Sequence, residues 1–113
     1  MVSPQEARAL HRAASTVHVA PEMLDYLARL ARAVRRSPHV ELGISPRAAL
    51  SLLEAARAAA LLAGREFVLP DDLKLMLVAA WAHRLILTAE AELEGHSPRA
   101  LLEEVARATE VPR

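Results

Sequence analysis

Residues 43–64 decide the fold, and they read Gly-Ile-Ser-Pro-Arg-Ala-Ala-Leu-Ser-Leu-Leu-Glu-Ala-Ala-Arg-Ala-Ala-Ala-Leu-Leu-Ala-Gly. A Ser-Pro pair favours a helix start, because the Ser hydroxyl caps a free N–H and Pro lacks the N–H that would be unpaired there. Gly64 suits the position after a helix end. Between residues 48 and 63 only Ser51, Glu54 and Arg57 are polar. We therefore predict a central helix over 46–63 that neighbours cover on most sides.

Two further Ser-Pro pairs, Ser3-Pro4 and Ser97-Pro98, predict helix starts in the same way. Pro21 and Pro70 mark two more. Apolar side chains recur at helical spacing along all of these segments. For the helix after Pro21, the pattern points the following side chains inward: Leu24, Leu27, Leu30, Ala31 and Val34. The predicted fold is all-α, a small bundle of about five helices over 4–14, 21–36, 46–63, from about 70, and 98–108.

Very short strands are predicted near 17–19, 67–69 and 83–87, and 83–87 is open between a strand and an extension of the helix before it. Segments 15–20, 37–44 and 64–69 are interpreted as connections.

The composition narrows the class of protein. Of 113 residues, 53% are apolar but only 3% aromatic, so Ala and Leu must supply the core. Fourteen basic and fourteen acidic residues cancel, which disfavours a dedicated nucleic-acid binder. There is no cysteine, and no apolar run reaches the roughly 18 residues of a membrane span. We expect one domain over 1–113, located in the cytoplasm.

A complete active site is missing from the sequence. There is no Gly-x-x-x-x-Gly-Lys loop for phosphates and no cysteine nucleophile. The five histidines lack metal-ligand spacing, so no metal site is predicted. Helix-dipole complementation explains Asp71 and Asp72, and a Glu103–Arg107 pair would explain Glu103. We expect no catalysis from the chain alone.

Arg47 is the most unusual charged residue, because it falls in the first turn of a helix, where the helix dipole disfavours a cation. One interpretation is an anion site, in which the guanidinium lies beside free backbone N–H groups. The other is a surface residue, solvated or paired with Glu41. Local chemistry leaves both open.

The segment Gly43-Ile44-Ser45-Pro46-Arg47-Ala48 resembles the Gly-x-Ser-Pro-Arg-Ala motif in the C-terminal lid of MoxR-type AAA+ ATPases. The resemblance covers almost the whole chain. One departure is Leu69, which stands where the family usually has Thr or Ser, so a weaker cap is expected there. The other matching segments occur in the expected order along the chain: Val17-His18-Val19, Leu24-Asp25-Tyr26-Leu27, Arg35, Val40–Gly43, an alanine-rich helix, Gly64–Val68, Pro70–Leu73, His83–Leu87 and a short charged tail ending Val111-Pro112-Arg113.

The resemblance implies a role for each motif residue. Arg47 matches the sensor-2 arginine, the catalytic residue that reaches from the lid to the nucleotide phosphates. Gly43, Ser45 and Pro46 would shape that helix start and belong with Arg47 to the nucleotide-binding set.

The resemblance also implies that the chain is a fragment of a longer ATP hydrolase, because the P-loop core domain, magnesium motif and arginine finger are absent. ATP and Mg²⁺ would bind in the parent, not to this chain alone. The expected partners are its own P-loop core domain, identical subunits in a hexameric ring, and von Willebrand factor A-domain proteins. The parent would act as a chaperone-like remodeller, and an exposed apolar strip on the lid would dock on the core.

The alternative is an independent helical module that binds protein or DNA through four arginines and has no nucleotide role. Those arginines are Arg29, Arg32, Arg35 and Arg36. Zero net charge makes DNA the less favoured partner.

Overall fold

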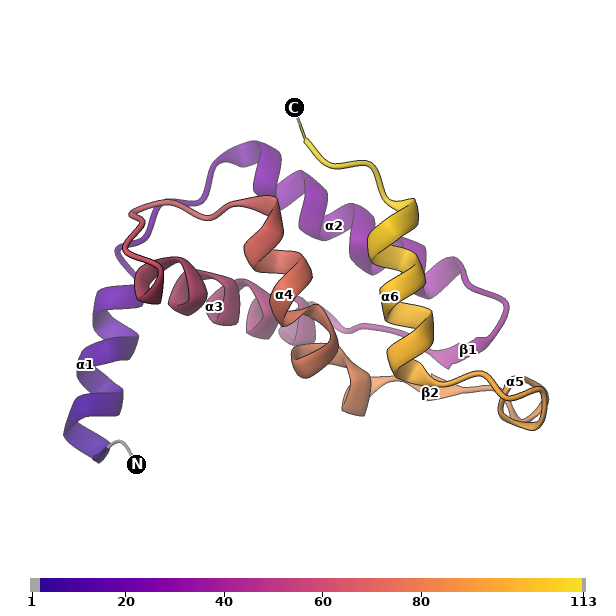
Figure 1. The fold of residues 1–113 in the computed structure, drawn as a ribbon. Coiled ribbons are helices and arrows are strands. Elements are labelled where there is room, and N and C mark those ends of the chain that lie inside the picture. The colour runs from indigo at the N-terminus through magenta and orange to yellow at the C-terminus, as the bar shows by residue number, and fades with distance from the viewer. Residues whose placement is uncertain (1–2, 113) are drawn as a thin grey trace.

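The computed structural model describes residues 3–112; Met1, Val2 and Arg113 of the expected domain lie outside the described residues. The predicted mostly helical bundle is confirmed (Figure 1). Its elements are α1 (Pro4–Ala14), α2 (Pro21–Arg36), β1 (Val40–Leu42), α3 (Pro46–Leu62), α4 (Pro70–Trp81), the 3-10 turn η1 (Ala82–Arg84), β2 (Ile86–Leu87), α5 (Ala89–Leu93) and α6 (Pro98–Ala108).

The three Ser-Pro pairs start helices as predicted. In each, the Ser hydroxyl accepts the N–H of the residue three positions later, at 3.1 Å. At the other end of α3, Gly64 has a φ of 80° and donates its N–H to the Leu61 carbonyl at 2.9 Å. Without a Cβ, Gly64 adopts this left-handed conformation at no steric cost, which ends the helix.

Helix α4 begins without a side-chain cap from Leu69, as the sequence predicted. The Asp72 carboxylate instead accepts the Leu69 N–H at 2.7 Å. Arg65 holds that carboxylate through two hydrogen bonds, of 2.6 and 2.7 Å. The Arg65 guanidinium is the main reason that the pKa of Asp72 lies below its ordinary value, and the Leu69 N–H adds to the effect. Asp72 is therefore a structural residue that compensates for the missing cap.

The short elements differ from the prediction. Strand β1 lies inside 37–44, which was wrongly interpreted as a connection, and it pairs antiparallel with β2. Of the predicted strand at 83–87, only Ile86–Leu87 forms a strand, because Ala82–Arg84 forms a 3-10 turn. The segments 17–19 and 67–69 meet in a single bridge between His18 and Phe67. Helix α5, a sixth helix, was not predicted.

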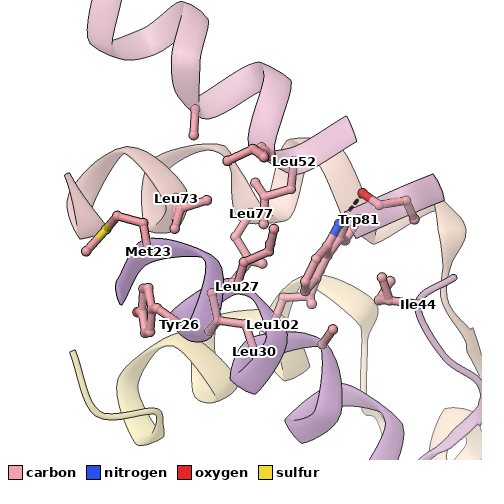
Figure 2. Packing of buried hydrophobic residues seen from close by; sticks show 14 of the residues in the cluster. Met23, Tyr26, Leu27, Leu30, Ile44, Leu52, Leu73, Leu77, Trp81 and Leu102 are labelled. Carbon is pink, nitrogen blue, oxygen red and sulfur yellow. Dashed lines mark hydrogen bonds between the residues drawn. The ribbon is translucent and has the colours of Figure 1, made fainter. Parts of the chain in front are cut away.

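The core lies where α2, α3, α4 and α6 meet (Figure 2). Its largest fully buried side chains are Trp81, Tyr26, Leu30, Leu52, Leu73, Leu77, Leu102 and Val34. The inward position predicted for Leu24 is wrong, since this side chain is 48% exposed. Met23 and Tyr26 are buried in its place, so the apolar face of α2 is rotated from the predicted one.

Large apolar side chains also lie on the surface. Leu42 and Ile86 are cross-strand partners on β1 and β2, and both are exposed. The other large apolar side chains that are exposed are Leu24, Leu50, Leu62, Phe67, Leu75 and Leu93. That they form one docking strip stays a prediction. Within residues 3–112, no helix has the length and apolar character to cross a membrane.

The ion pair between Arg65 and Asp72 should be measurable as stability. The Asp72 side chain is 4% exposed, and Arg65→Met would leave its charge without an ionic partner and with the Leu69 N–H as its remaining hydrogen bond. We expect the free energy of unfolding at pH 7 to fall by about 2 kcal/mol in chemical denaturation. The exposed pair Arg99–Glu103 supplies the control, since Arg99→Met should change stability by less than about 0.5 kcal/mol.

The ion pair between Arg65 and Asp72 should also make the free energy of unfolding depend on pH in the acidic range. A lowered folded pKa means that the contribution is complete above the ordinary carboxyl pKa of about 3.9 and is lost as pH falls through the folded value. Arg65→Met should flatten this part of the stability profile. An equally steep acid limb in both proteins would contradict the assignment.

Candidate functional site

The predicted site begins at the first turn of α3. Ser45 has extended backbone angles, φ −76° and ψ 162°, and its hydroxyl caps the Ala48 N–H. The Ala49 N–H donates to the Ser45 carbonyl at 3.0 Å, and Pro46 has no N–H. Among the described residues, the Arg47 N–H is the one first-turn amide left without a partner. The predicted set of free N–H groups is therefore reduced to one, so an anion here would have to be held mainly by side chains.

The Arg47 side chain is exposed and makes no ion pair with any residue in 3–112. The proposed partner Glu41 forms no ion pair with it, so the salt-bridged alternative is wrong and the solvated one remains. The first turn of α3 carries no acidic residue either. A guanidinium and the positive end of a helix thus lie together with no compensating charge. Such a position favours an anion from outside the domain.

Trp81 holds this turn in place from the end of α4. Its indole Nε1–H donates to the Ala48 carbonyl at 2.8 Å, the dashed line in Figure 2. The Trp81 side chain is completely buried. Because Ala48 follows Arg47 directly, the hydrogen bond fixes the backbone from which the Arg47 side chain extends.

The loop before α3 is held on two sides. Ile44 is 3% exposed and packs in the core. Gly43 lies against the last turn of α2, where a Cβ at position 43 would be 3.4 Å from the Cα of Arg35. This approach brings the Arg35 stem beside the loop.

A groove of about 740 Å³ lies along this loop. Arg35, His83 and Arg84 contribute its basic groups, and the Arg84 Nε–H donates to His83 Nε2 at 3.4 Å. No aspartate or glutamate between residues 3 and 112 lines it. The remaining lining residues are Leu42, Gly43, Ile44, Ser45 and Ala48. Of the four residues predicted to form the nucleotide-binding set, Gly43 and Ser45 therefore line the groove. Pro46 and Arg47 do not line it and are the first two residues of α3.

Sequence reasoning did not assign Arg35, Arg84 or Trp81 to the site. A signal was available for two of them, because Arg35 and His83-Arg84 belong to the segments that carry the family resemblance. Their meeting at one groove depends on the packing of α2 and η1 around the loop before α3.

Other charged groups have structural roles. Arg29 pairs with Asp25 at 3.1 Å and donates to the Glu110 carbonyl at 2.6 Å, so the proposed DNA-binding set loses one member to the fold. The predicted Glu103–Arg107 pair is wrong: Arg99 pairs with Glu103, and Arg107 with Glu104. No group of three potential metal ligands occurs within the described part of the chain.

Comparison with known proteins identifies the domain. Residues 32–105 match the AAA lid domain family. The chain belongs to that family. YeaC of Bacillus subtilis is 35% identical over 91% of this lid domain, and the chaperone MoxR1 of Mycobacterium tuberculosis is 32% identical over 80% of it. These matches cover 32% and 26% of the two relatives, so the lid domain spans about a third of their length or less.

A solved structure supports the same assignment. A "putative ATPase" from Cytophaga hutchinsonii superposes with a TM-score of 0.83 at 29% identity, over 90% of the lid domain and 34% of that protein. The lid domain is therefore of the kind found in MoxR-like AAA+ ATPases.

The hydrogen bond from Trp81 to Ala48 can be tested by a pair of conservative changes. Trp81→Phe removes the buried donor and part of the ring, and we expect a loss of about 2–3 kcal/mol in the free energy of unfolding, followed by circular dichroism. Tyr26→Phe is the control, because the Tyr26 hydroxyl is buried without a hydrogen-bond partner. Its removal should be neutral or slightly stabilising. Equal losses in both variants would contradict a special role for the Trp81 donor.

Proposed function

We propose that this lid domain senses the nucleotide in a longer AAA+ ATPase, with Arg47 in the sensor-2 role. The observation that supports this proposal most is the exposed, unpaired guanidinium of Arg47 at the start of α3. The hydrogen bond between Trp81 and Ala48 holds this helix start in place. In this proposal, 1–113 is the lid of a parent that also contains a P-loop core. Gly43, Ser45 and Pro46 set the direction in which α3 begins.

The chemistry of the site suits phosphate recognition. ATP with Mg²⁺, bound by the core of the parent, would supply the phosphoryl group, and the lid itself has no residues that gather as metal ligands within 3–112. Arg47 would donate hydrogen bonds to phosphate oxygens and reduce the charge that develops during transfer.

The same contact could report the state of the nucleotide. An arginine that binds the terminal phosphate interacts differently with ATP and ADP, so it can shift the equilibrium between two lid positions. Helices α3 and α4 pack together and are joined by Trp81, which favours movement of the lid as a rigid unit.

The family resemblance extends the proposal to the assembly. We propose that the parent is an ATP hydrolase that works in the cytoplasm as a hexameric ring and remodels other proteins in a chaperone-like manner. The similarity to MoxR1 of Mycobacterium tuberculosis, which is named a chaperone, supports this direction. Von Willebrand factor A-domain proteins are the proposed partners.

Replacing Arg47 by Ala in the full-length ATPase tests the sensor-2 role. We expect the ATP hydrolysis rate to fall on the order of tenfold to a hundredfold, because one preorganised donor to the transferring phosphate is lost. The lid should stay folded or become slightly more stable, because a cation leaves the positive end of α3. Melting temperature therefore separates loss of chemistry from loss of fold.

Arg32→Ala is the matched control, an exposed arginine of α2 without an ion pair in the described residues. It should hydrolyse ATP at the parental rate. An unchanged rate in Arg47→Ala, or the same fall in both variants, would refute the assignment of Arg47.

A further inference from the structure

We propose that Arg35 and Arg84 form a second anion-binding pair, which lets the lid bind the polyphosphate chain of a nucleoside triphosphate without the core domain. The inference extends the proposed function, on which it rests for the identity of the ligand. It adds a binding site of the lid itself beside the single arginine of the sensor-2 role.

The first argument is convergence. Arg35 lies in the last turn of α2 and Arg84 in η1, 49 positions later in the chain, yet both line the groove along the loop before α3. That groove also includes Ser45 and Ala48, the residues on either side of the Pro46-Arg47 pair. Two segments far apart in the chain, α2 and η1, thus bring basic groups to one groove beside the start of α3.

The second argument is charge. Neither Arg35 nor Arg84 makes an ion pair with a described residue, and no carboxylate from 3–112 lines the groove. The helix dipole favours a cation at both positions, because Arg35 lies at the carboxyl end of α2 and Arg84 at the carboxyl end of η1. Four other arginines do have carboxylate partners, namely Arg29, Arg65, Arg99 and Arg107. What distinguishes Arg35 and Arg84 from the other unpaired arginines is that both line one groove. An anion from outside the domain would supply the missing counter-charge.

The third argument is positioning. The stem of Arg35 lies against Gly43, and the Arg84 Nε–H donates to His83 Nε2, so both side chains have contacts that limit their freedom. Less ordering is then required on binding, which favours affinity. Leu42, Ile44 and Ala48 contribute apolar lining beside these basic groups.

The size of the groove indicates the class of ligand. About 740 Å³ lies within the range of small-molecule sites and exceeds what one phosphate would fill. Two guanidinium forks suit a chain of adjacent phosphate groups, since each fork can bind two oxygens. A nucleoside triphosphate has both this chain and a larger body.

The test is titration of the 113-residue chain with ATP, inorganic tripolyphosphate and adenosine, followed by amide chemical shifts in NMR and by calorimetry. We expect ATP and tripolyphosphate to bind and to shift the amides of Gly43, Ser45 and Arg84, and adenosine not to do so. Arg35→Gln and Arg84→Gln should each weaken tripolyphosphate binding about tenfold, and the double variant more.

The controls are Arg32→Gln, on the same helix as Arg35, and Arg99→Gln on α6, both of which should bind like the parent. Equal weakening in a control would show non-specific charge attraction and overturn the inference. Absence of tripolyphosphate binding would also overturn it, as would equally tight binding of a poly-glutamate peptide, which would indicate an acidic protein segment as the occupant.

The two proposals fail separately. If Arg35→Gln and Arg84→Gln bind tripolyphosphate like the parent while Arg47→Ala still slows hydrolysis in the full-length ATPase, the second anion site is wrong and the sensor-2 role stands. If the double variant loses binding while Arg47→Ala leaves hydrolysis unchanged, the sensor-2 role is wrong and the groove remains a polyphosphate site.

Discussion

The hydrogen bond from the Trp81 indole to the Ala48 carbonyl is the interaction on which the site depends. It joins the end of α4 to the first turn of α3, inside the core, at 2.8 Å. A buried N–H without an acceptor would be costly, so the register of the two helices is constrained at this point. The same contact determines where the Arg47 side chain starts and where η1 leaves α4 with Arg84. The same hydrogen bond therefore constrains both the packing of the core and the positions of Arg47 and Arg84.

Much of the fold could be predicted because its long helices carry local signals. The Ser-Pro pairs predicted the starts of α1, α3 and α6, and a proline alone marked α2 and α4. The strands were predicted only in part: β2 lies within the predicted 83–87, whereas β1 was missed, because it exists through its pairing with β2 across about 45 residues. Leu24 was misassigned for a related reason: helical spacing defines an apolar arc, but the neighbours decide which edge of that arc is covered.

The candidate site was predicted only in part, and the missing part is instructive. Arg47 stood out because a cation in a first turn violates a local rule. Arg35 broke no rule, since a basic residue at the end of a helix is ordinary, and Arg84 lay in a segment of uncertain structure. Their common groove arises from contacts between Gly43 and α2 and from the turn after Trp81. Residues that act through tertiary convergence leave a weak signal in a single sequence.

The distribution of hydrogen bonds at α3 also limits how the lid would bind a phosphate in the proposed role. Many helix starts bind anions with several backbone N–H groups. Here Ser45 and Pro46 remove most of them, because Ser45 accepts one N–H, its carbonyl accepts another, and Pro46 has none. Recognition by side chains follows, and an arginine on a flexible stem can engage or release a phosphate without unwinding the helix. In the sensor-2 role that we propose, the helix would stay capped with and without the terminal phosphate, and only the guanidinium would change partner.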